Sequence, residues 1–273
     1  MSVFLVSMGA LICYLAGAIG QGLRNSGQAI PRCLVQSVTA IGLVFHIIAL
    51  YGSIHSSGGI NLGIFTMGSL TAMMVTMLVL ISSLKKPSES LLLLILPITI
   101  VAIILNLSIP TQRIYWNPDP YMVVHVLLSI MAYGILMVAA CQAILLSYQE
   151  RQLRTHRQTI NTLPPLQTME KLLFEFLSVG VLLLMLSLGS GFLFLEDMFA
   201  QKLVHKTVLS MMAWGLFATL LIGHWQFGWR GQTAVRWTLA GVIFLLLAYF
   251  GSRFVLDCII LGQPCFPSFI DIN

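Results

Sequence analysis

Charged residues are scarce in this chain: Asp, Glu, Lys and Arg make up 8% of 273 residues, against roughly 25% in soluble globular proteins. This scarcity excludes an ordinary soluble domain. Hydrophobic residues make up 58% of the chain, and the mean hydropathy is +0.93. The composition therefore predicts an integral membrane protein, with membrane lipid as a partner and residues 1–273 forming a single membrane domain.

Paired cysteines and an N-terminal basic segment are also missing. None of the five cysteines forms a C-x-x-C pair, which argues against a thiol redox motif or a zinc site. Cys258 and Cys265 are near neighbours, and a disulfide between them would require a tail outside the cytoplasm. No basic residue precedes Arg24, so the first apolar run is expected to be a retained helix and not a signal peptide. The net charge of +5 is assigned to basic loops at the membrane surface, with no nucleic acid as partner.

Long apolar runs separated by short polar segments predict an all-α polytopic fold with about eight transmembrane helices. Each run is near the roughly 20 residues that a helix needs to cross the hydrocarbon core. Alternation with a period of two, typical of a membrane β-barrel, does not occur. The expected spans are 2–22, 34–54, 65–84, 91–109, 122–148, 172–195, 204–225 and 237–257.

The basic residues are distributed unevenly between the two sets of loops. Ten of the 14 Lys and Arg residues fall in every second connection, beginning with the first, and four fall elsewhere. Basic residues accumulate on the cytoplasmic side of a membrane protein. The pattern therefore predicts that both termini lie on the outer, periplasmic side.

Histidines inside the spans are functional candidates, because an ionisable residue in the membrane is costly. His46 falls near the middle of the second span, where it could form a helix–helix hydrogen bond or serve as an axial haem ligand. His125, Ser129 and Tyr133 recur at i, i+4 and i+8, so they form one polar stripe. This stripe either binds a neighbouring helix or holds a cofactor near the outer face.

A second group of polar and aromatic residues ends the seventh span. His205 and His224 bracket this span about 28 Å apart, so they cannot bind one metal ion. The sequence "GHWQFGWRGQTAVRW" follows from Gly223, and an aromatic belt and a basic inner surface explain most of it. The residues explained in this way are Trp225, Trp229, Trp237, Arg230 and Arg236. His224 needs no place in such a belt and is the strongest cofactor candidate.

Three sequence stretches together resemble the cytochrome c assembly family of polytopic membrane proteins, in particular its small bacterial inner-membrane branch. They are "PPLQTMEKLLFEFLSVGVLLLMLSLGSG", "VVHVLLSIMAYGILMVAACQAILL" and "GHWQFGWRGQTAVRW…YFGSR", within a family-like core of about 34–257. The resemblance implies haem handling at the bacterial inner membrane, with a non-covalently bound b-type haem (heme b). It also implies other membrane or cytochrome c assembly proteins as partners.

The resemblance implies roles for individual residues. His46 and His224 would be the intramembrane pair of metal ligands, and His125 the first outer histidine. On straight helices His46 and His224 differ in depth by about 15 Å, which tilted helices or shifted boundaries would have to remove. The expected cofactor-binding neighbours, as walls of the macrocycle or partners of its propionates, are Trp225, Trp229 and Arg230, with Arg236 beside them.

Two departures from the family pattern shape the functional prediction. The tryptophan-rich outer loop is missing, since the corresponding connection reads only "LEDMFAQKLV". The segment expected to carry a second outer histidine reads "LDCIILGQPCFP". With no acid–base pair or nucleophile in evidence, we expect haem binding or transfer and not an enzyme. The alternatives are an accessory or regulatory subunit that has lost haem and, less favoured, a small-solute transporter, for which no inverted repeat is found.

Overall fold

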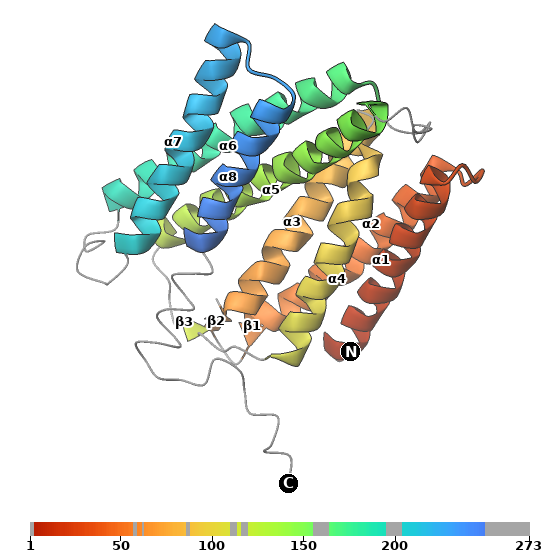
Figure 1. Ribbon diagram of the computed structural model, residues 1–273. Coiled ribbons are helices and arrows are strands. Elements are labelled where there is room, and N and C mark those ends of the chain that lie inside the picture. The colour runs from red at the N-terminus through yellow and green to blue at the C-terminus, as the bar shows by residue number, and fades with distance from the viewer. Residues whose placement is uncertain are drawn as a thin grey trace, which may run out of the picture.

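The computed structural model describes residues 3–56, 59–61, 63–85, 88–109, 114–115, 120–154, 164–194 and 204–248. The described part is a polytopic helical protein, which confirms the predicted all-α membrane fold (Figure 1). Seven of its helices are long and apolar enough to cross a membrane, and α8 is a shorter apolar helix. The helices are α1 (Val3–Asn25), α2 (Arg32–Ile54), α3 (Ile64–Lys85), η1 (Glu89–Leu91), α4 (Leu92–Ser108), α5 (Pro120–Arg154), α6 (Leu166–Phe194), α7 (Val204–Phe227) and α8 (Gln232–Leu246).

Three of the predicted helix boundaries were wrong by several residues. The fifth helix was expected to end at residue 148 but continues to Arg154. The sixth helix was expected from residue 172 but begins at Leu166, directly after Pro165, because proline is well suited to the start of a helix. The eighth was expected from residue 237 but begins at Gln232. The rest of that predicted span beyond residue 248 lies outside the described residues, as do Cys258 and Cys265.

A small antiparallel sheet supplements the helices in the described part of the chain. It consists of β1 (His55–Ser56), β2 (Gly59–Asn61) and β3 (Ile114–Tyr115), in the order β1-β2-β3. The register pairs His55 with Ile60 and Ile60 with Tyr115. The sheet therefore joins the connection after α2 to the connection after α4.

The helices form two four-helix bundles. In the first bundle (α1–α4), α1 packs on α2, α2 on α3, α3 on α4, and α4 back on α1. The second bundle (α5–α8) closes in the same way, through α5–α6, α6–α7, α7–α8 and α5–α8. Contact between α3 and α5 joins the two bundles, and Figure 1 shows α1 and α7 at opposite sides of the array.

Polar contacts inside the membrane fasten these helix pairs. Thr76 of α3 and Thr99 of α4, both fully buried, join their hydroxyls at 2.9 Å. Ser129 of α5 and Ser187 of α6 do the same at 2.6 Å. Such hydrogen bonds matter in the bilayer because apolar side chains gain little by moving from lipid to a protein interior.

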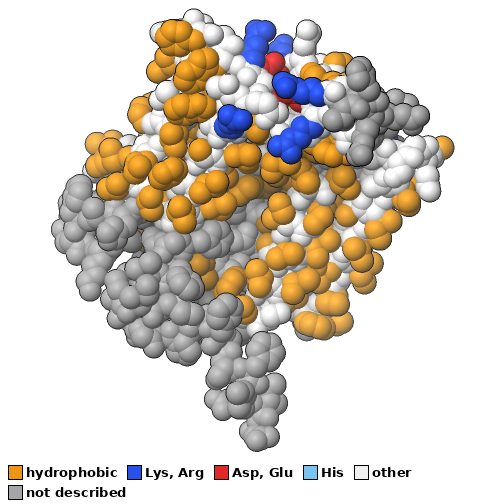
Figure 2. Space-filling view, viewed as in Figure 1, with side chains coloured by type: hydrophobic (Ala, Val, Ile, Leu, Met, Phe, Trp, Pro, Cys, Tyr) orange, Lys and Arg blue, Asp and Glu red, His pale blue; other side chains and the backbone are white. Residues whose placement is uncertain are grey.

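One end of the molecule, the basic end, carries most of the described arginines and lysines. Here α1, α3, α5 and α7 finish and α2, α4, α6 and α8 begin. Figure 2 shows Lys and Arg side chains gathered at this end, above a surface that is largely hydrophobic where it is described. The positive-inside rule assigns the basic end to the cytoplasmic side, and this sidedness stays a prediction.

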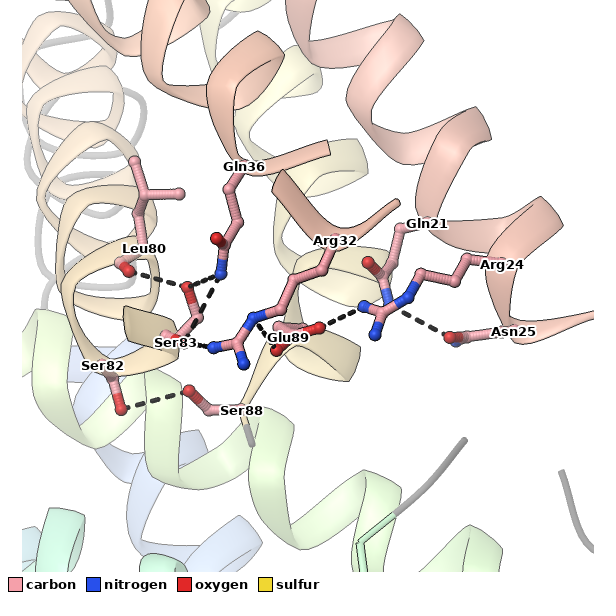
Figure 3. A network of polar contacts seen from close by, with 10 residues as sticks. All are labelled: Gln21, Arg24, Asn25, Arg32, Gln36, Leu80, Ser82, Ser83, Ser88 and Glu89. Carbon is pink, nitrogen blue, oxygen red and sulfur yellow. Dashed lines mark hydrogen bonds and ion pairs between the residues drawn. The ribbon is translucent and has the colours of Figure 1, made fainter. Parts of the chain in front are cut away.

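A buried carboxylate, that of Glu89, joins helices of the first bundle at the basic end; Glu89 with Arg24 and Arg32 is called the Glu89 clasp. Glu89 of η1 accepts a hydrogen bond from Arg24 of α1 and forms an ion pair, at 2.5 Å, with Arg32 of α2 (Figure 3). Arg32 also donates to the backbone carbonyl of Ser83 in α3. Because Glu89 is only 8% exposed, one carboxylate fixes the ends of three helices.

The clasp gives the first testable prediction. Glu89→Ala leaves two arginines without their acceptor and should lower the free energy of unfolding by about 1–3 kcal/mol. Thermal unfolding of the purified protein in detergent measures the loss. The matched control is Arg154→Ala, which removes a solvent-exposed i,i+4 ion pair with Glu150 and should change stability by at most about 0.5 kcal/mol. Equal shifts in the two variants would contradict the role of the clasp.

Candidate functional site

A groove of about 1160 Å³ lies where the two bundles meet and reaches the basic end. This volume is ample for a large organic ligand, since ligand pockets usually span roughly 300–1,000 Å³. Apolar side chains form most of the wall, and charged side chains gather near the basic end. The lining residues are Leu78, Ile81, Ser82, Ile135, Val138, Gln167, Glu170, Lys171, Phe174, Glu175, Phe176, Ser178, Val179, His224, Trp225 and Arg230.

His224 is the one histidine among these lining residues, and a hydrogen bond fixes the tautomer of its imidazole ring. Its Nδ1 lies 2.9 Å from the backbone carbonyl oxygen of Trp229. A carbonyl oxygen only accepts, so Nδ1 carries the proton and donates it. Nε2 is then the nitrogen with the lone pair. Nε2 has no hydrogen-bond partner among the described residues and is not one of the buried unpartnered atoms.

The aromatic ring of Phe174 fixes the plane of this imidazole. The two rings stack with centroids 3.5 Å apart and an interplanar angle of 15°. One face of the imidazole is therefore covered by α6, while Nδ1 is tied to the turn after α7. A neutral imidazole oriented through Nδ1–H is the arrangement that metal-binding histidines commonly use.

The turn between α7 and α8 supplies the carbonyl that orients His224. Gly228 has φ +66° and donates its N–H to the carbonyl of His224, a left-handed cap that favours glycine at this position. Gly231 also has a positive φ, of 55°, and its N–H donates to Glu170 of α6 at 3.2 Å. Glu170 therefore anchors the turn to the same helix that carries Phe174.

Close packing of Trp229 on α7 sets the direction of its carbonyl. The Trp229 indole lies directly against Gly223, so closely that a Cβ atom at Gly223 would overlap the ring. The indole also packs on Trp237, with centroids 5.5 Å apart. Gly223 is thus required by a close approach.

The expected cofactor neighbours fall on different sides of this turn. Trp225 and Arg230 line the groove, whereas Trp229 contributes its backbone carbonyl to His224 and packs its ring away into the α7–α8 contact. Trp225 is 72% exposed, so it also faces lipid at the interface. Arg236 is exposed on α8 and is not one of the lining residues.

The start of α6 contributes groove residues that sequence reasoning missed. With the helix expected from residue 172, Glu170 and Lys171 would precede it. Because α6 begins at Leu166, both lie inside it and line the groove together with Glu175, one turn further on. The run of two prolines at 164–165 was the signal for the earlier start.

His46 lies in the first bundle, in surroundings unlike those of His224. Its Nδ1 is 3.3 Å from the hydroxyl of Tyr14 in α1, and its Nε2 is 3.0 Å from the hydroxyl of Ser69 in α3. His46 is 2% exposed and does not line the groove. The structure therefore does not bring His46 and His224 into one site, and their pairing is not seen among the described contacts.

His125 begins the polar stripe of α5, and this stripe contacts neighbouring helices. Ser190 of α6 donates its hydroxyl proton to a backbone carbonyl, so it accepts from Nδ1 of His125 at 3.0 Å. Ser129 bonds Ser187 of α6, and Tyr133 bonds Ser210 of α7. The stripe thus serves helix packing, the first of its two predicted roles. The side chain of His205 is not among those described.

Fold and groove together define a polytopic helical membrane protein with a groove between two four-helix bundles. Residues 34–260 match the model of the cytochrome C assembly protein family, and the chain belongs to that family. This agrees with the resemblance seen in its sequence stretches. The matched region covers α2 to α8 but not α1.

Individual relatives agree with the family match. The inner membrane protein YpjD of Escherichia coli strain K12 is 34% identical over 258 residues, covering 90% of this chain and 95% of the relative. An uncharacterized 28.8 kDa protein of Azospirillum brasilense is 33% identical over 147 residues, covering 52% of this chain and 54% of the relative. No solved structure matches the chain.

The close approach at Gly223 gives a second testable prediction. Gly223→Ala should push the Trp229 indole off α7, break its carbonyl bond to His224 and lower the free energy of unfolding by about 1–3 kcal/mol. Gly215→Ala is the matched control, because it lies in the same helix with no atom within 4 Å of the new Cβ. This control should be neutral or gain up to about 1 kcal/mol. Thermal unfolding in detergent compares the two, and a Gly223 variant as stable as the Gly215 variant would contradict the packing.

Proposed function

We propose that this protein binds a b-type haem non-covalently in the groove, where Nε2 of His224 would hold the iron. The observation that carries the proposal is the held imidazole: Nδ1 donates to Trp229, one face is covered by Phe174, and Nε2 keeps its lone pair. Histidine is a common axial ligand of haem iron, and iron requires the lone-pair nitrogen.

The groove has an apolar wall and a charged end, which suits a flat, amphipathic group. Apolar side chains from α3, α5 and α6 would contact the macrocycle, and Trp225 would close it toward lipid. Lys171 and Arg230 lie at the basic end, where they could pair with the propionates, since arginine binds carboxylates bidentately. Arg230 also suits the inner-surface anchoring that its position predicts.

The biological role proposed is haem handling in cytochrome c assembly at the bacterial inner membrane. Family membership and the inner-membrane relative in Escherichia coli support it. We propose binding and transfer of haem as cargo and no bond-making by side chains. Membrane lipid and other assembly proteins of the membrane would be the partners. Ligand roles for His46 and His125 stay predictions of the family resemblance.

Haem binding is tested by the absorption spectrum of the protein purified in detergent, with and without added haem. We expect the wild type to show a Soret band. His224→Ala should lower the affinity for haem by at least about tenfold, because the bond from the imidazole to the iron is lost. His55→Ala is the matched control: His55 is exposed, stacks on Tyr51 at the far end of α2 and should leave the spectrum unchanged.

Other outcomes of this experiment are equally informative. A folded wild-type protein that stays colourless with haem would contradict the proposal and support an accessory subunit that has lost haem. A His224→Ala variant that binds haem like the wild type would place the site elsewhere. Uptake of a small solute into vesicles containing the protein would instead support a transporter.

A further inference from the structure

The surroundings of His46 use up both of its ring nitrogens. The neutral imidazole has one donor and one acceptor nitrogen, while the hydroxyls of Tyr14 and Ser69 can each donate or accept. Both hydrogen bonds, at 3.3 and 3.0 Å, are therefore satisfied in either tautomer. A buried polar ring in the membrane needs such partners, and His46 already has them.

The space around His46 is closed by tight helix packing. Tyr14 is 0% exposed, and its ring meets the imidazole edge-on, with centroids 5.8 Å apart. On its other side the Tyr14 ring is seated against Gly42 of α2, where an added Cβ would lie 2.9 Å from the ring. The interior of the first bundle around His46 is therefore filled by side chains, and a flat macrocycle has no place beside this imidazole.

The groove itself offers one side chain of the kinds that usually bind haem iron. Those kinds are histidine, methionine, cysteine and tyrosine. Among the sixteen described residues that line the groove, His224 is the only member of this group. The neighbouring charged residues Lys171 and Arg230 are cations, better suited to carboxylates than to iron.

We infer that haem in this groove has a single protein ligand, His224, and that His46 is a structural bridge between α1, α2 and α3. This assignment rests on the proposed haem site and replaces the expected pair of intramembrane ligands. One axial position of the iron is then left for a small exogenous ligand. Release of haem to a partner requires one protein–iron bond to break, which suits a protein that hands its cargo on.

The spin state of the ferrous haem tests the inference in the wild-type protein. With one imidazole ligand we expect a high-spin, five-coordinate ferrous spectrum and ready binding of carbon monoxide. Two imidazole ligands would give sharp low-spin α and β bands and slow carbon monoxide binding. The measurement is the reduced spectrum of the purified, haem-loaded protein with a carbon monoxide titration.

Variants separate the structural role of His46 from a ligand role. We expect His46→Asn to keep the wild-type spin state and to change haem affinity by less than about threefold. Its unfolding temperature should fall, as it should in Tyr14→Phe and Ser69→Ala, which each remove one of the two hydrogen bonds. These two milder variants keep the comparison available if His46→Asn does not fold.

A low-spin wild-type spectrum would overturn the inference, and its conversion to high spin in His46→Asn would assign His46 as the second ligand. Failure of the proposed function looks different. In that case the wild type binds no haem at all, or the His224→Ala variant binds haem as well as the wild type does. There is then no His224-bound haem whose spin state could be measured.

Discussion

The hydrogen bond from Nδ1 of His224 to the carbonyl of Trp229 is the contact on which the candidate site depends. It selects the tautomer, directs Nε2 and ties the imidazole to a turn that cannot move freely. That turn is fixed in three ways: by the left-handed cap at Gly228, by the indole seated on Gly223, and by the carboxylate of Glu170. The orientation of one side chain therefore depends on the backbone geometry of a turn, which Gly223, Gly228 and Glu170 hold in place.

The two-bundle architecture places this imidazole at a seam and not inside a closed core. Each bundle has internal polar contacts of its own, those of His46 in the first and the Ser129–Ser187 contact in the second. Among the described residues the main contact between the bundles is that of α3 with α5, and the groove lies beside it. A seam between two rigid units is a common location for ligand sites, because neither unit has to open its core. The helix outside the family match, α1, contributes to the first bundle through Tyr14 and the Glu89 clasp.

Much of the fold followed from hydropathy and little of the site geometry did. Apolar run lengths located the helices because the bilayer sets their length, whereas the start of α6 at Leu166 depended on proline at a helix terminus. His224 was recognisable because anchoring could not explain it. Its stacking partner Phe174 was not, and neither was Glu170, which binds the N–H of Gly231, since stacking and a side chain–backbone bond across helices leave no periodic signal. The pairing of His46 with His224 came from family resemblance, and sequence cannot show that two histidines occupy different bundles.

Chemical rescue tests the central claim most directly, namely that an imidazole nitrogen at this position binds haem iron. His224→Gly removes the ring and leaves a space beside Phe174 that free imidazole can enter. The claim predicts that the purified variant binds haem weakly, and that added imidazole restores the Soret band and the affinity while the fold stays intact. Haem binding by the variant at wild-type strength without imidazole would contradict it, as would a folded variant to which imidazole restores nothing.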